Sequence, residues 1–102
     1  MARLVVLYGT PKDPAAFDAY YASTHIPIAK RIPGLRKYEV SKGPVLTPAG
    51  PSRVHLTAIL HFDDLAAIGA AFASPEGQKA AVDVETFATG GVEMFLFDDV
   101  EV

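Results

Sequence analysis

The chain has 102 residues, of which half are hydrophobic, a net charge of −3 and no cysteine. The lack of cysteine excludes disulfides, thiolate catalysis and cysteine-ligated metals, and the slightly acidic balance argues against nucleic acid as a partner. The length predicts a single domain over residues 1–102. Neither a signal-peptide pattern nor an apolar run of about 20 residues is present, so we expect no membrane partner and a cytoplasmic location.

The first third of the chain predicts a strand followed by a helix. Residues 2–10, ARLVVLYGT, form a short apolar run that ends at glycine and proline. In the next segment Asp13 is expected to be the helix N-cap, with Pro14 at the first helical position. One apolar face then repeats every three or four residues, at Phe17, Tyr21, His25 (or Thr24) and Ile28.

The rest of the chain predicts two strands, a helical region and a last strand. Pro44 has no amide donor, which places that end of the second strand at a sheet edge. The helical region is expected to restart at Ser74, with Pro75 at the first helical position. The four segments are residues 34–46, 53–62, 63–88 and 92–100, with a loop over residues 47–52.

This order, βαββαβ, predicts an α+β ferredoxin-like sandwich in which both helices cover one face of an antiparallel sheet. The other face would then be bare. In the third strand, alternation places Val54, Leu56, Ala58, Leu60 and Phe62 on one side, and His55, Thr57, Ile59 and His61 on the other. The second set is mixed and not plainly hydrophilic, so we expect a partner sheet to cover it in a two-fold homodimer.

Pro27 stands where the first helix should continue. It lacks an N–H and its ring would clash with the Ser23 carbonyl, so the helix is expected to kink or stop near Ile26. His25 would then lie at the negative end of the helix, which favours its protonated form. Tyr20 and Tyr21 would supply hydroxyls one turn back. The same residues could equally be core aromatics and a capping histidine.

The stretch FDAYYASTHIPIAKRIPGLRKYEV, residues 17–40, resembles the signature of the EthD family, named for an ethyl tert-butyl ether degradation protein. The matching features are an aromatic pair, a histidine, a proline two residues later, and PGL leading into a strand with a tyrosine. The family positions fall on Tyr21, His25 and Pro27, with Tyr20 and Tyr38 as supporting candidates.

The resemblance implies a dimeric α+β barrel of two ferredoxin-like subunits. EthD-like proteins accompany oxidative degradation pathways and are often labelled oxidoreductases or reductases. Some relatives in polyketide pathways act as decarboxylases, dehydratases or cyclases without a cofactor. The resemblance itself does not name a reaction.

Neither a metal nor a nucleotide cofactor is expected. His55 and His61 lie six residues apart on one strand, roughly 20 Å from end to end, so they cannot share an ion within one subunit. We expect these two histidines to line the barrel or the dimer interface, and count them with Tyr38 as candidate substrate-binding residues. No phosphate-binding glycine motif is present.

Three functional hypotheses remain open at this point. The chain could be a cofactor-independent enzyme acting on a small hydrophobic or aromatic compound in a degradation or secondary-metabolite pathway. In that case His25, Tyr21 and Tyr20 transfer a proton or donate hydrogen bonds to a substrate oxygen. It could instead be a non-catalytic binding or accessory protein of an oxygenase pathway. In the third hypothesis these residues only support the kink, and no pocket exists.

Overall fold

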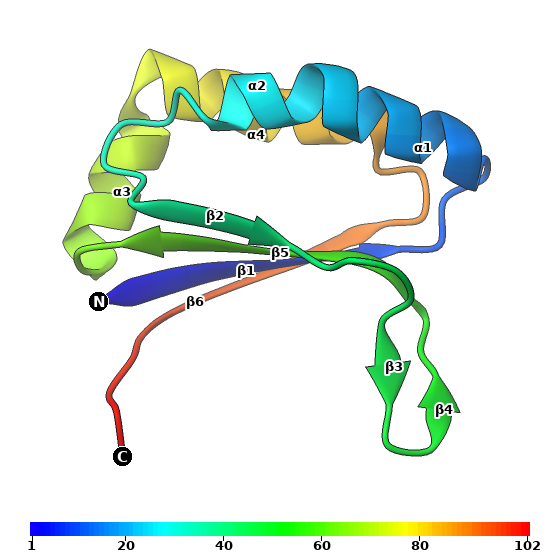
Figure 1. Ribbon diagram of the computed structural model, residues 1–102. Helices are drawn as coiled ribbons and strands as arrows, with labels where there is room; N and C mark the ends of the chain where they lie inside the picture. The colour runs from blue at the N-terminus through cyan, green and yellow to red at the C-terminus, as the bar shows by residue number, and fades with distance from the viewer.

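The computed structural model describes residues 1–102 as one layer of helices on one sheet (Figure 1). A four-stranded antiparallel sheet has the strand order β2-β5-β1-β6, and a two-stranded hairpin, β3-β4, stands apart from it. In chain order the elements are β1 (Ala2–Gly9), α1 (Pro14–Tyr20), η1 (Tyr21–His25), α2 (Ile26–Ala29), β2 (Lys37–Val40), β3 (Leu46–Thr47), β4 (Gly50–Pro51), β5 (Val54–Phe62), α3 (Leu65–Ala73), α4 (Pro75–Phe87) and β6 (Val92–Asp98).

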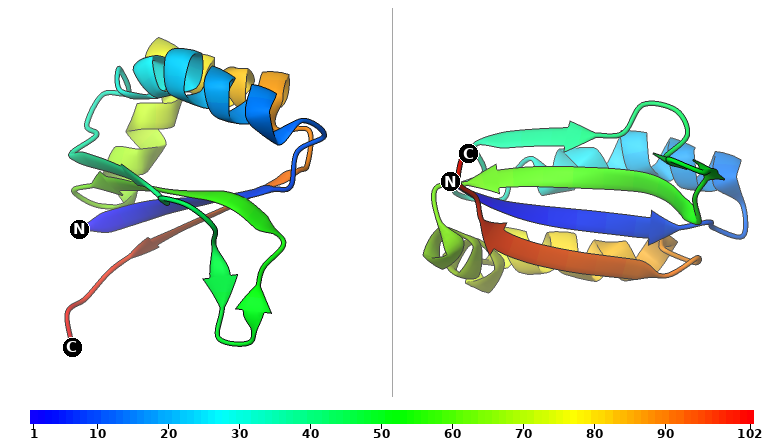
Figure 2. Two further views of the ribbon diagram at one scale, coloured as in Figure 1. Left: turned by 45° about the vertical axis from the view of Figure 1, so that its right-hand side comes forward. Right: turned by 90° about the horizontal axis from the view of Figure 1, so that it is seen from below.

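The ferredoxin-like α+β prediction is confirmed. All helices lie over one face of the sheet, and no helix covers the other (Figure 2). β2 is an edge strand of the sheet, but Pro44, which was expected to lie at the edge end of this strand, falls outside it, because β2 ends at Val40. No helix is long and apolar enough to cross a membrane.

The core lies between the helices and the sheet, and strand alternation creates it. Every second residue of β1 is buried, because side chains in a strand alternate between the two faces. Tyr8 and Phe62 are the largest fully buried side chains. The elements α1, η1 and α2 follow one another directly and together form the first helical segment. The ring of Tyr8 meets Phe17 and Tyr21 of this segment edge-on, at centroid distances of 5.4 and 5.7 Å. The core therefore joins β1 directly to that segment.

The first helical segment does not end at Pro27. Of the two expected outcomes near Ile26, a kink or a stop, the stop is therefore wrong. The backbone stays helical through His25 and Ile26, and α2 continues to Ala29. Residues Tyr21–His25 form a π turn, in which the Ile26 N–H donates to the Tyr21 carbonyl five residues earlier. The wider π turn accommodates the proline, since Pro27 then falls in the first turn of α2, where a missing N–H is tolerated.

The segment between β2 and β5 also differs from the prediction. The second strand ends at Val40, and residues 46–47 pair instead with residues 50–51 across a tight turn. This hairpin projects from the sheet on the side away from the helices (Figures 1 and 2). The expected loop over residues 47–52 therefore contains the turn of a hairpin.

The expected alternation of β5 holds only in part. The register of β1 with β5 shifts between Tyr8 and Gly9, opposite the start of β5. His55 contacts Phe17 of α1, with ring centroids 4.9 Å apart, whereas His61 lies on the helix-free face beside Arg3. The two histidines therefore do not share a face, because the register shift interrupts the period of two.

The junction of α3 and α4 forms as the sequence predicts. Asp64 caps α3 by accepting from the Ala67 N–H, and Ser74 caps α4 by accepting from the Gly77 N–H at 3.1 Å. Gly77 lies directly against the Ala71 carbonyl, so any Cβ at this position would clash with backbone atoms. The turn between the two helices therefore depends on this glycine.

We expect Gly77→Ala to lower the free energy of unfolding by about 1–3 kcal/mol, the usual cost of overpacking. Gly69→Ala in α3 is the matched control, because a Cβ there meets nothing within 4 Å. That variant should gain roughly 0.5–1 kcal/mol from helix propensity. Urea unfolding of both variants measures the difference. If both variants changed the free energy of unfolding by the same amount, the close approach of Gly77 to the Ala71 carbonyl would be contradicted.

Candidate functional site

An apolar cavity of ≈ 320 Å³ lies between the sheet and the helices. Its walls come from β1, β2, β5 and β6 on one side and from the helices on the other. Apart from His25 and Gly69, every lining residue is hydrophobic or aromatic. The lining residues include three tyrosines, Tyr8, Tyr21 and Tyr38. The third hypothesis, in which no pocket exists, is therefore wrong.

The cavity reaches the surface beside β6 and α3. Three of its lining side chains, Leu65, Met94 and Leu96, are also exposed to solvent. β6 is an edge strand, and no further strand covers it. An apolar compound can therefore reach the interior along this edge.

The carboxylate of Asp83 joins α4 to the first helical segment. The hydroxyl of Tyr20 donates to Oδ1 at 2.6 Å, and Nδ1 of His25 lies 2.8 Å from Oδ2. His25 is only 5% exposed. A carboxylate packed against so buried a side chain requires hydrogen-bond donors, and Tyr20 and His25 supply them.

The π turn makes this arrangement possible. Tyr20 and His25 are five residues apart, and in an α-helix of 3.6 residues per turn they would point about 140° apart. Within a π turn, residues five apart are hydrogen-bonded neighbours. Both side chains therefore reach the same carboxylate.

The geometry determines the state of His25. The Asp83 carboxylate accepts a hydrogen bond from Nδ1–H, which leaves the lone pair of the neutral ring on Nε2. Burial lowers the pKa of His25 below its ordinary value, and the hydrogen bond and charge of Asp83 oppose this only in part. The protonated form expected at a helix end is thus not favoured. Since the helix continues, His25 has no terminal carbonyls beside it.

Two atoms of the site make no hydrogen bond within the chain: Nε2 of His25 and the hydroxyl of Tyr8. No polar side-chain atom that is fully shielded lacks a partner, and both residues line the cavity. These two atoms therefore face the cavity. A bound molecule could reach both of them.

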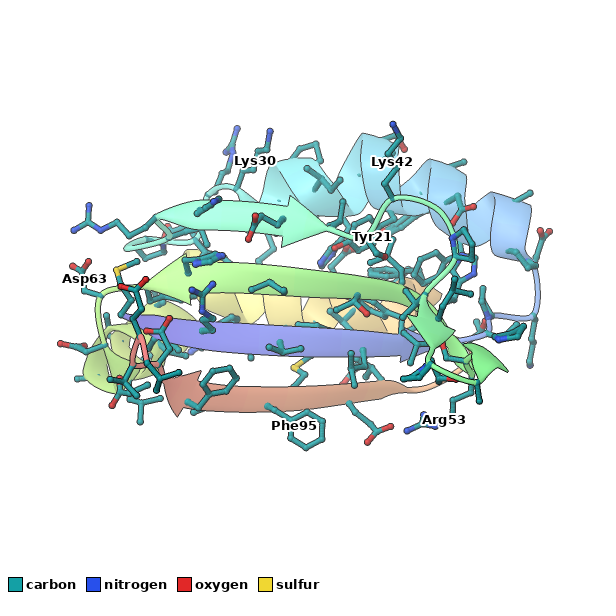
Figure 3. The ribbon with its side chains drawn as sticks, turned by 60° about the horizontal axis from the view of Figure 1, so that its bottom comes forward. Tyr21, Lys30, Lys42, Arg53, Asp63 and Phe95 are labelled. Carbon is teal, nitrogen blue, oxygen red and sulfur yellow. The ribbon has the colours of Figure 1, made fainter.

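The other two tyrosines of the cavity bond to each other. The hydroxyls of Tyr21 and Tyr38 lie 2.6 Å apart, one donating and the other accepting (Figure 3 labels Tyr21). Burial raises the pKa values of Tyr8, Tyr21 and Tyr38. All three hydroxyls therefore keep their protons and act as hydrogen-bond donors.

The predicted site residues are only partly brought together. His25, Tyr21 and Tyr38 line the cavity, whereas Tyr20 directs its hydroxyl to Asp83. His55 and His61 lie outside the cavity. Nε2 of His55 is 2.7 Å from the Asp18 carboxylate on α1, and Nε2 of His61 is 2.6 Å from the Glu39 carboxylate.

Sequence reasoning missed Asp83 and Tyr8. Asp83 falls within the apolar stripe of α4, next to Val84 and three residues after Ala80. An acidic residue in such a stripe needs a buried partner, and this signal was present in the sequence. Tyr8 continues the buried alternation of β1, which likewise predicts a hydroxyl directed to the interior.

The side chains that could bind a metal are not gathered into a site. No group of three His, Asp, Glu or Cys residues comes close enough to hold an ion. Around the cavity, His25 and Asp83 are the ligand-type residues, and they bond to each other. Their arrangement suits proton transfer by His25.

Comparison with known proteins identifies the family, because residues 10–91 match the EthD domain. The chain belongs to this family. A protein of Rhodococcus erythropolis, described as an uncharacterized 11.0 kDa protein in the thcB-thcC intergenic region, is 45% identical over 102 residues. That alignment covers all of this chain and 98% of the relative.

Solved structures show the same fold. An EthD family protein of Bacillus halodurans is 31% identical with a TM-score of 0.90, covering 98% of this chain and 99% of that one. SnoaB of Streptomyces nogalater, a cofactor-independent oxygenase, is 21% identical with a TM-score of 0.66, covering 99% and 94%. A dimeric ferredoxin-like protein of Thermobifida fusca is 14% identical with a TM-score of 0.68, covering 94% and 88%.

The lowered pKa of His25 predicts a pH-dependent stability. The unfolded chain, with an ordinary histidine pKa of about 6.5, binds the proton more readily than the folded chain. The free energy of unfolding should therefore fall as the pH drops from about 6.5 through the folded-state pKa. His25→Gln should lose less stability over the same interval in urea titrations at several pH values. If the free energy of unfolding fell equally with pH in the wild type and in His25→Gln, the lowered pKa of His25 would be contradicted.

Proposed function

We propose that this EthD-domain protein is a cofactor-independent enzyme that removes a proton from a small hydrophobic or aromatic compound. The observation that supports the proposal is the state of His25. It is buried and neutral, Asp83 holds it through Nδ1, and Nε2 faces an apolar cavity. A neutral imidazole oriented by a carboxylate is a common general base.

In the proposed reaction, Nε2 takes a proton from the bound compound, and the ring becomes an imidazolium. The Asp83 carboxylate, 2.8 Å from Nδ1, compensates the new positive charge. A tyrosine hydroxyl of the cavity donates a hydrogen bond to the oxygen on which negative charge develops. Tyr20 has a positioning role, since its hydroxyl donates to Asp83.

The likeness to SnoaB supports this proposal at the level of fold. A protein of the same architecture is named as an oxygenase that needs no cofactor. The family resemblance also implies an oxidoreductase role, and this part of the proposal is supported by the family and by the likeness to SnoaB. The substrate is likewise proposed. The apolar lining of the cavity supports a compound with few polar groups.

A second candidate is a non-catalytic binding protein of an oxygenase pathway. The nearly all-apolar lining supports it, because such a wall binds hydrophobic compounds without chemistry. The two candidates differ in what His25 does. In the binding protein it only orients the ligand, and its loss weakens binding without changing any rate.

A general-base probe separates the two candidates. 5-Nitrobenzisoxazole is a small aromatic compound that ring-opens when a base removes its C–H proton, and the coloured phenolate product reports the rate. We expect saturable acceleration above buffer, and a loss of about a hundred- to ten-thousand-fold in His25→Ala. His55→Gln is the matched control, because His55 also pairs with a carboxylate but lies outside the cavity. Saturable binding without acceleration would favour the binding protein.

We also propose that two copies associate through the helix-free face of the sheet. Structural relatives of this fold are dimeric. On that face β6 exposes Phe95 and Phe97, which are 53% and 44% exposed and pair with Val5 and Arg3 of β1 (Figure 3 labels Phe95). Burial of two such aromatic side chains favours a stable interface.

Phe95→Glu is expected to convert a dimer into a monomer, because a charge would replace the aromatic contact. The mass in solution, from light scattering after size-exclusion chromatography, measures this. Val82→Glu on α4 is the control, since Val82 is also exposed but lies on the helical layer. A wild-type protein that is monomeric at high concentration would contradict the proposal.

A further inference from the structure

The polar groups of the cavity specify more than a hydrophobic ligand. Nε2 of His25 carries a lone pair, because Nδ1 bears the proton that Asp83 accepts. It can therefore only accept a hydrogen bond from a neutral ligand. The tyrosine hydroxyls have the opposite capacity. Tyr21 and Tyr38 share one hydrogen atom between them, so the second is left to donate, and the Tyr8 hydroxyl has no partner in the chain.

A charged ligand does not fit these walls. No lysine or arginine lines the cavity, so a carboxylate or phosphate would be buried without a counter-charge. A cation would find one neutral acceptor, Nε2 of His25, but no carboxylate lines the cavity, so its charge would also be buried without a counter-charge. The ligand is therefore neutral when it binds.

A hydroxyl is the smallest neutral group that both donates to Nε2 and accepts from a tyrosine. Its carrier must match the apolar remainder of a cavity of ≈ 320 Å³, about twice the size of the ~150 Å³ engineered cavity that binds benzene. We propose that the ligand is a neutral phenol of one or two rings. Its O–H donates to Nε2 of His25, and its oxygen accepts from a tyrosine hydroxyl. This inference specifies the substrate class of the proposed function and rests on it.

In this complex the phenolic O–H is the proton donor to Nε2, and the bound phenol keeps its proton at rest, as the buried tyrosine hydroxyls do. When Nε2 takes this proton in the reaction, the O–H bond breaks, an N–H bond forms, and the electron pair stays on the oxygen. The donating tyrosine hydroxyl stabilises the negative charge that then develops there.

Phenol and toluene are the test pair, because they differ by a hydroxyl in place of a methyl group. A cavity with only apolar contacts binds toluene more tightly, since phenol must give up hydration of its hydroxyl. We expect wild-type protein to bind phenol at least as tightly as toluene in calorimetric titrations. His25→Leu should weaken phenol binding about ten-fold and leave toluene binding nearly unchanged.

Tyr38→Phe is a second variant that preserves the ring and removes one hydroxyl of the Tyr21 pair. It should also weaken phenol and not toluene, and it keeps the test valid if His25→Leu fails to fold. His55→Gln, outside the cavity, should change neither affinity.

The outcomes distinguish this inference from the function it rests on. Tighter binding of toluene by the wild type, or phenol affinity unaffected in both variants, overturns the phenol assignment. The general-base function stands in that case if 5-nitrobenzisoxazole is still opened in a His25-dependent way. Binding of neither compound overturns both the phenol assignment and the use of the cavity as a ligand site.

Discussion

Both oxygens of the Asp83 carboxylate accept a hydrogen bond from the first helical segment, and the site depends on these two bonds. They connect α4 to the π turn and keep a largely buried carboxylate supplied with donors. They also select the tautomer of His25, and so decide that the lone pair of Nε2 faces the cavity. Without Asp83, the ring could turn, or place its proton on the other nitrogen.

The cavity itself is a cost to a chain of this size. A domain of 102 residues has little stability to spare, and empty apolar space forfeits packing contacts. The aromatic cluster beside the cavity offsets part of this loss. The rings of Tyr8, Phe17, Tyr21 and Phe87 all lie within 5.8 Å of one another, centroid to centroid. The end of the cavity lined by Tyr8 and Tyr21 is thus closely packed.

Local signals in the sequence predicted much of the fold. Asp13 and Ser74 cap their helices as expected, and the alternation of β1 gives the buried face. These features depend on neighbours within a few residues, which a sequence displays directly. The failures came where distant residues decide. Pro27 predicted a kink or a stop, but the helix continues through a π turn, where Tyr20 and His25 pack against Asp83, 58 residues beyond His25.

The three histidines also show which features local sequence signals reveal and which depend on distant residues. The sequence by itself determined the βαββαβ order and, through the resemblance of residues 17–40, the family, because both rest on residue types and short spacings. It could not tell His25 from His55 or His61 as a group facing a cavity. Each of the three has a carboxylate partner, at 2.8, 2.7 and 2.6 Å. Only the tertiary structure decided which histidine lines the apolar cavity. The cavity is enclosed by strands and helices that are distant in the sequence, so no local pattern predicts it.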